Sequence, residues 1–242
     1  MSEFKFPTET VELPSKGLIY PKDNPLSSGK VEMKYMTARE EDILTNQNYI
    51  NNGTVLDKLL ESLVISEGVK VKDLIVGDKN AVLVAARILG YGKDYTFSYG
   101  GVEHIVDLST LESKHFDESL ITPGVNEFEF TLPKSGNTIK YKLLNGHDEI
   151  KINREIEGLK KIDKNASPDL STRLKYLITS INGDTESKTI REFVGNYLLA
   201  MDSRALREHI RNTQPDINMN VTLDSGEEVA VPISINFFWP DY

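Results

Sequence analysis

The chain reads LIVGDKNAVLVAAR at residues 74–87 and LLAMDSRALREHIR at residues 198–211. At a constant spacing of 124 residues, both stretches carry a Leu, an aliphatic residue, an Asp, an Ala, a second aliphatic residue and an Arg in the same order. A single match of this kind would arise by chance. Six matches in one ungapped block predict that the two stretches are copies of one element.

Shorter blocks flank this match in the same order along the chain. The turn sequence Leu-Pro-Ser-Lys-Gly at 13–17 returns as Leu-Pro-Lys-Ser-Gly at 132–136. Residues 33–35 align with 139–141, residues 41–43 align with 148–150, and Gly101 with Glu103 aligns with Gly226 and Glu228. We therefore predict an internal duplication, with a first α+β unit at residues 1–124 and a second at residues 125–242.

Each predicted unit has the same order of elements. Strands at 11–13 and 128–132 precede the Pro/Gly turns, and second strands follow at 31–36 and 139–143. Leucines at helical spacing then predict helices through 56–63 and through 170–181. Each unit closes with a hairpin, 95–106 in the first and 217–235 in the second, and a charged helix is expected at 153–167. The fold class is α+β.

Helix starts are marked by capping residues. Thr37 and Glu40 form a Thr-x-x-Glu capping box, and Asn145 with Asp148 stands in the corresponding place. Asp78 and Asp202 each precede a helical stretch, where a carboxylate can cap the free N–H groups. We interpret Thr37, Glu40, Asp78 and Asp202 as structural helix caps.

Composition limits the classes of function. The formal net charge is −9, and this disfavours nucleic acid and anionic membranes as partners. Cysteine is absent, so a disulfide, a thiolate nucleophile and a cysteine zinc site are all excluded. The four histidines stand apart from one another, and we expect no metal. The chain has no apolar run long enough to span a membrane and no secretory leader, so we expect it to remain where it is made.

Two groups of acids could form catalytic sites. The Glu40-Glu41-Asp42 triplet could pair carboxylates, but acids are also favoured in the first turn of a helix. Asp78 and Asp202 each have an Arg nine residues downstream, but their equivalent places in two copies favour a fold feature. Neither a phosphate-binding loop nor a nucleophile elbow occurs. We predict that the chain is not an enzyme and has no cofactor.

The last residues differ from the rest of the chain. Residues 236–242 read NFFWPDY and contain four aromatic residues, including the only Trp. Because aromatic side chains dominate interface energetics, Phe237, Phe238, Trp239 and Tyr242 are candidate protein-binding residues. The alternative is that the tail packs onto its own domain, since exposed apolar area is unfavourable at about 25 cal/mol per Å².

Several of these motifs together resemble a known family. They are the opening at 13–17, Tyr20-Pro21, the run Met-Thr-Ala-Arg-Glu-Glu-Asp-Ile-Leu at 36–44, Val76-Gly77-Asp78 and Phe-Phe-Trp-Pro at 237–240. They look like the baseplate hub assembly proteins of T-even-type contractile-tailed phages. Some relatives carry cysteine pairs in their hairpins, but this chain has glycine-containing tips at 100–101 and 224–226, so metal binding is not carried over.

The resemblance implies a non-enzymatic assembly factor for the central hub of a phage tail baseplate. Its partners would be other hub or tape-measure proteins, and it would act in the host cytoplasm. The alternative is a structural hub subunit retained in the virion tail. Two further hypotheses are a hydrolase or nucleotide-binding enzyme and a nucleic-acid-binding regulator. The absent motifs disfavour the enzyme, and the acidic charge disfavours the regulator.

Overall fold

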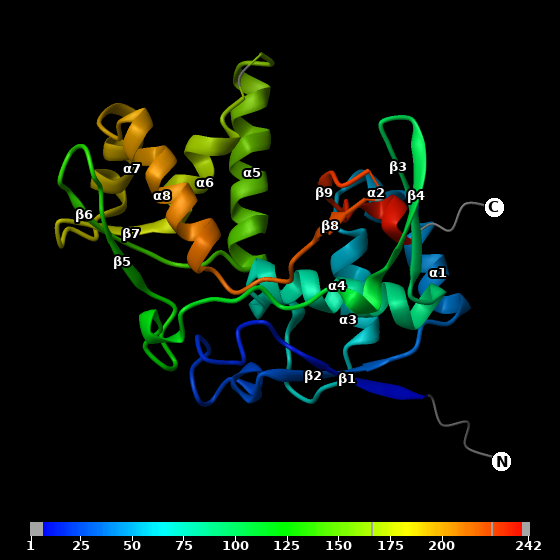
Figure 1. Cartoon of the computed structure of the whole chain (residues 1–242). Helices are drawn as coiled ribbons and strands as arrows, with labels where there is room; N and C mark the ends of the chain where they lie inside the picture. The colour runs from blue at the N-terminus through cyan, green and yellow to red at the C-terminus, as the bar shows by residue number, and fades with distance from the viewer. Residues whose placement is uncertain (1–6, 166, 224, 239–242) are drawn as a thin grey trace. The chain divides into compact units, whose positions relative to one another are not determined.

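A computed structural model of the chain describes residues 7–165, 167–223 and 225–238 (Figure 1). It is a mixed α+β structure with small antiparallel sheets, as the sequence predicts. Two compact units are present. Unit 1 holds the chain up to Gly17, Lys22–His115 and the chain from Pro215 onward, and unit 2 holds Leu18–Pro21 and Phe116–Gln214.

This grouping differs from the predicted boundary after residue 124, because the C-terminal segment belongs with unit 1. Main-chain hydrogen bonds hold it there: Lys114 donates to Asp216 at 2.7 Å, and Asn218 donates to Glu112 at 2.8 Å. The hairpin predicted to close the second copy is present, but it packs in unit 1.

Unit 1 combines two hairpins, a two-stranded N-terminal sheet and several helices. Its elements are β1 (Thr8–Glu12), η1 (Pro25–Ser28), β2 (Lys30–Lys34), α1 (Ala38–Leu44), α2 (Gln47–Asn51), α3 (Val55–Leu63), η2 (Val71–Asp73), α4 (Val76–Tyr91), β3 (Asp94–Tyr99), β4 (Val102–Asp107), η3 (Leu108–Thr110), β8 (Asn220–Thr222), β9 (Glu228–Ala230) and η5 (Ile235–Phe238).

The core of unit 1 follows from helical spacing. In α3, Val55, Leu59, Leu60 and Leu63 recur every three to four residues and are all buried. Helix α4 is buried on most sides and ends at Tyr91, and the following residue, Gly92, has a φ of 83° that suits a residue without a side chain.

Unit 2 is an antiparallel sheet in the order β5-β6-β7 with the helices α5 to α8. Its elements are η4 (Glu118–Leu120), β5 (Phe128–Thr131), β6 (Thr138–Tyr141), α5 (Gly146–Ile162), α6 (Asp169–Leu177), β7 (Ile178–Ile181), α7 (Ser187–Asn196) and α8 (Ala200–Thr213).

The predicted helix through residue 181 is wrong at its end. Helix α6 stops at Leu177, and Ile178–Ile181 form strand β7, which pairs with β6. Two β-branched isoleucines favour a strand, and Ile178 lies opposite Tyr141 in the sheet. The charged helix expected at 153–167 begins and ends earlier. It is α5, which follows the cap residue Asn145 and ends at Ile162.

Candidate functional site

The Leu-Pro turn of unit 1 (residues 13–17) is held by Asp78. The Ser15 N–H donates to Asp78 Oδ1 at 2.9 Å, and the Ser15 hydroxyl donates to Asp78 Oδ2 at 2.6 Å. Both residues are fully buried. The carboxylate therefore holds a turn that lies 63 residues away in sequence.

The Leu-Pro turn of unit 2 (residues 132–136) is held in the same way by Asp202. The N–H groups of Lys134 and Ser135 donate to its two carboxylate oxygens at 2.7 and 3.0 Å. Burial alone would raise the pKa of the Asp202 carboxyl, but hydrogen bonds from Lys134 and Ser135 outweigh burial and lower that pKa.

The predicted cap role of these two aspartates needs correction. The N-cap of α4 is Ile75 and that of α8 is Leu199, so Asp78 and Asp202 each lie three residues inside their helix. Each helix therefore starts earlier than the sequence pattern indicates, and its aspartate binds the main chain of a distant turn.

Thr37 and Glu40 form the predicted capping box at the start of α1. The Glu40 carboxylate is fully buried and accepts from Lys34 Nζ at 2.8 Å, from the Thr37 hydroxyl at 2.6 Å and from the Ser62 hydroxyl at 2.7 Å. Burial would raise the pKa of Glu40, but these three donors outweigh it and lower the pKa to about 2.

Unit 2 repeats this arrangement at the start of α5. Asn145 and Asp148 form a capping box, and Lys142 Nζ lies 2.7 Å from the Asp148 carboxylate. A Lys, a cap residue and an acid thus follow at intervals of three in both units. Glu40 corresponds to Asp148, so the alignments of 33–35 with 139–141 and of 41–43 with 148–150 are displaced by one or two residues.

A third matched contact follows the buried helix of each unit. Val64, directly after α3, forms an antiparallel bridge with Met33, and Ile178, directly after α6, pairs with Tyr141. Met33 and Tyr141 each immediately precede the Lys that binds the buried acid. These matched contacts support the predicted internal duplication, which stays a prediction.

The aromatic tail is partly inside unit 1. Phe237 and Phe238 are fully buried in η5, and the Phe237 ring lies 4.9 Å from that of Tyr95 in an edge-on contact. These two residues pack within their own unit and present no surface to a partner. Removing the apolar area of both rings from water is favourable in free energy. Trp239 and Tyr242 lie outside the described residues.

Exposed apolar side chains occur in both units. On the β3–β4 hairpin of unit 1, Val102 is 59% and Ile105 is 74% exposed. Where α7 leads into α8 in unit 2, Tyr197, Leu199 and Met201 are 61%, 45% and 68% exposed. We call these three residues the 197–201 cluster. Clustered apolar exposure of this kind is typical of protein-binding surfaces.

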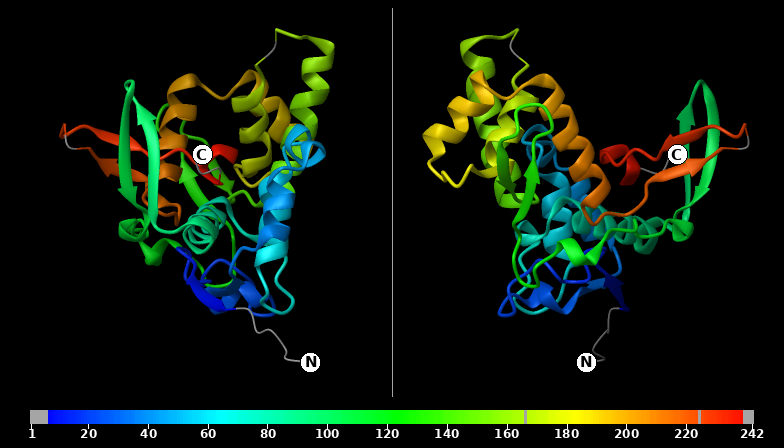
Figure 2. Two further views of the ribbon diagram at one scale, coloured as in Figure 1. Left: turned by 90° about the vertical axis from the view of Figure 1, so that its right-hand side faces the viewer. Right: turned by 60° about the vertical axis from the view of Figure 1, so that its left-hand side comes forward.

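A groove in unit 1 runs along β4 and β8. It is lined by Glu103–Asp107 of β4, by the following residues 110–112 and, around β8, by residue 218 and residues 220–223. Figure 2 shows the β3–β4 hairpin in green next to the β8–β9 hairpin in orange and red. At one end the Tyr99 hydroxyl donates to Glu227 at 2.8 Å, and at the other Ser113 and Ile217 form an antiparallel bridge.

Sequence reasoning missed this groove. Residues 103–112 and 218–223 are more than a hundred positions apart, and no motif links them. The adjacent Ile105 and Val106 in the predicted hairpin are the one local signal, because successive strand residues point to opposite faces and one of these two apolar side chains then faces away from the core.

No group of three or more His, Asp or Glu residues in the described part of the chain could hold a metal ion. Each helix of residues 7–165, 167–223 and 225–238 is too short or too polar to cross a membrane. No protein-family model matches the chain, and searches of curated proteins and of solved structures found no match either.

Proposed function

We propose that this chain is a non-enzymatic protein-binding factor that assists assembly of the central hub of a phage tail baseplate. The observation that carries the protein-binding part is the 197–201 cluster, because three large apolar side chains are exposed within five residues. The baseplate part rests on the motifs at 13–17, 36–44 and 237–240, which resemble hub assembly proteins.

The hydrogen bonding of the buried acids supports a non-enzymatic role. Asp78, Asp202 and Glu40 are fully buried, and each binds main-chain or side-chain groups of its own unit. A general acid or base has to reach a substrate proton, and these three carboxylates face turns and helix starts instead. Their place in the structure therefore favours a role in stability.

A pull-down from phage-infected cells tests this proposal. The tagged full-length chain is expected to capture hub or tape-measure proteins. A triple variant, Tyr197→Ser with Leu199→Ser and Met201→Ser, should capture at least fivefold less. The matched control is Ile162→Ser with Leu170→Ser, because these exposed apolar residues of unit 2 lie outside the cluster. A pull-down in which the tagged chain captures no phage tail protein would contradict the proposal.

The second candidate is a structural hub subunit, because the same motifs fit both roles. Mass spectrometry of purified virions separates the two. Presence at a fixed copy number in mature tails would establish the structural subunit, and absence from them would leave the assembly factor.

A further inference from the structure

The two strands beside the unit 1 groove each have an unpaired edge facing it. Strand β4 pairs only with β3, and β8 pairs only with β9, among the strands of the described residues. An unpaired edge presents N–H and C=O groups that can pair with another chain. The groove is therefore bordered by hydrogen-bonding main chain on both sides.

The pairing register identifies the outward groups of β4. The hairpin turns at Gly100-Gly101, with φ of 60° and 80°, so Tyr99 and Val102 are the closing hydrogen-bonded pair. Because hydrogen-bonded and non-bonded pairs alternate, the N–H and C=O groups of Glu103 and Ile105 point away from β3. Within the described residues no main-chain hydrogen bond uses these groups, and both residues line the groove.

The same reasoning applies to β8. Leu223 donates to Glu227 and Val231 donates to Met219, so Val221 points its main-chain groups toward β9. Asn220 and Thr222 then point outward, and both line the groove. The Asn220 N–H donates to the Asn218 side chain at 3.1 Å, whereas the outward main-chain groups of Thr222 have no main-chain partner among the described residues.

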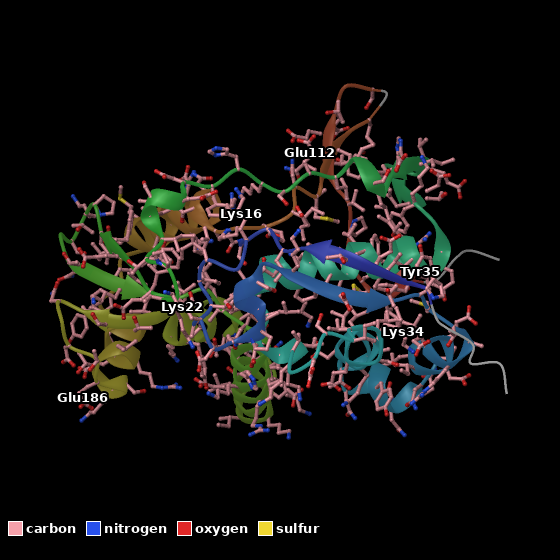
Figure 3. The ribbon with its side chains drawn as sticks, turned by 90° about the horizontal axis from the view of Figure 1, so that it is seen from below. Lys16, Lys22, Lys34, Tyr35, Glu112 and Glu186 are labelled. Atoms are coloured by element: carbon pink, nitrogen blue, oxygen red, sulfur yellow. The ribbon has the colours of Figure 1, made fainter. Side chains whose placement is uncertain are left out.

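The side chains around the groove indicate the chemistry of its occupant. Glu103, Asp107 and Glu112 line it, and the lining contains no Lys or Arg. Lys93 neutralises Asp107 at 2.6 Å, so Glu103 and Glu112 supply the remaining negative charge. Glu112 is labelled in Figure 3 on the chain beyond β4. Glu103 and Asp107 share one face of β4. On the other face, Val106 pairs with Tyr95 and His104 pairs with Phe97, and both of these β3 rings are buried.

We propose that this groove binds an extended segment of a partner protein, added as a strand to the outer edge of β4, in which basic and aliphatic residues alternate. Strand side chains point alternately to the two faces. One set would lie beside Glu103, which favours Lys or Arg, and the other beside Val106, which favours Val or Ile. Such strand addition combines main-chain affinity with side-chain specificity.

A second copy of this chain is a poorer occupant. Pairing of two β4 edges would bring the acidic residues of both copies together, and like charges directly opposite one another are destabilising. The length of β4, six residues, sets the length of the segment that can pair with it. The inference rests on the proposed protein-binding function and names the chemistry of one partner segment.

Fluorescence anisotropy with the full-length chain and a labelled, end-capped Lys-Val-Lys-Val-Lys-Val peptide tests this inference. Saturable binding at 0.15 M salt is expected, at least tenfold tighter than binding of Glu-Val-Glu-Val-Glu-Val. Methylating alternate peptide N–H groups should weaken binding at least tenfold while keeping the charge. Equal binding of the methylated peptide, or no binding of the parent peptide, would overturn the proposal.

Matched proline variants test the edge. Ile105→Pro removes an outward N–H on the groove side, and Thr96→Pro removes the outward N–H directly opposite it on β3. Proline is tolerated where an edge N–H faces solvent, and near-ultraviolet circular dichroism checks that both variants fold. Only Ile105→Pro should lose peptide binding, by at least tenfold. Equal affinity in both variants, or a dimer of the wild type that Ile105→Pro dissolves, would refute strand addition by a basic partner.

The charge requirement has its own variant. Glu103→Lys with Glu112→Lys should weaken the Lys-Val peptide at least fivefold and strengthen the Glu-Val peptide; unchanged preferences would overturn the stated chemistry. Failure of this inference leaves capture of tail proteins by the wild-type chain unchanged. If the proposed function is wrong, the wild-type chain captures no tail protein. The failure of the inference and the failure of the proposed function are therefore distinguishable.

Discussion

The start of α4 in unit 1 and the start of α8 in unit 2 share one contact and differ beside it. Both helices place a buried aspartate three residues after the N-cap, and both aspartates bind a Leu-Pro turn. The preceding residue is Gly77 in unit 1 and Met201 in unit 2. A Cβ at Gly77 would lie 1.9 Å from the Pro215 carbonyl oxygen, whereas Met201 is 68% exposed.

The aspartate contact stabilises each unit, and the residue before the aspartate is what differs between the two units. The shared contact is buried and polar, so the turn of each unit depends on its own aspartate. The helix start next to it is covered by the C-terminal segment in unit 1 and is open in unit 2. The uncovered end leaves the 197–201 cluster available to another protein.

The largest expected effect is from Gly77→Ala. The added methyl group would meet main-chain atoms of Pro215 and Asp216, which cannot move aside as a flexible side chain could. We expect a loss of about 3 kcal/mol in the free energy of unfolding of unit 1. Urea unfolding followed by hydrogen exchange in α4 measures it.

Gly195→Ala is the control for this change. Gly195 also lies in a helix, and a Cβ there would meet nothing within 4 Å. We expect it to gain about 0.5–1 kcal/mol from helix propensity. Equal effects at the two glycines would show that the C-terminal segment does not cover α4.

The next effect is from Asp78→Ala and Asp202→Ala. Each change leaves two donors of a Leu-Pro turn without their acceptor, and we expect losses of about 2.5 kcal/mol for unit 1 and about 2 kcal/mol for unit 2. Hydrogen exchange should show the loss in the unit that carries the change. Asp42→Ala, at an exposed position of α1, should stay within about 0.5 kcal/mol. A loss spread evenly over both units would contradict separate turn contacts.

Acid should weaken unit 1 through Glu40. The folded-state pKa of Glu40 is lowered from 4.5 to about 2, so its contribution is fully present above pH 4.5 and is lost as the pH falls toward 2. We expect a loss of about 2 kcal/mol over this range. The slope of unfolding free energy against pH should flatten in Glu40→Gln, and an unchanged slope would assign the acid sensitivity to other carboxyls.

The smallest effect on stability is expected from Met201→Ala. Its side chain is mostly exposed, so the free energy of unfolding of unit 2 should change by less than about 0.5 kcal/mol. Thermal unfolding measures this change. A large loss would mean that Met201 is part of a packed contact and would remove the contrast with Gly77.

Local patterns predicted many of the elements. The β3–β4 hairpin, the capping box of Thr37 and Glu40 and the apolar face of α3 follow from residues close together in sequence. The end of α6 was missed, because Ile178 becomes a strand residue only through pairing with β6. Propensity is a weak guide where a distant strand completes the structure.

The candidate sites show the same division. The sequence identified Asp78 and Asp202 as equivalent structural residues but misjudged what they bind, because the Leu-Pro turns lie more than sixty residues away. The aromatic tail was recognised as unusual, but its sequence left open whether it packs inside. The structure shows that the two phenylalanines pack inside unit 1, because both are fully buried and Phe237 contacts Tyr95.

The amino-acid sequence by itself determined the α+β class, the capping box at the start of α1, the hairpins and the absence of cysteine chemistry, because these depend on residue type and short spacing. Tertiary structure alone decided that the C-terminal segment joins unit 1, that two unpaired strand edges border one groove and that Gly77 is covered while Met201 is open. The physical reason is that main-chain hydrogen bonds and burial join residues by their position in space, and no local pattern records which distant segment will supply the partner.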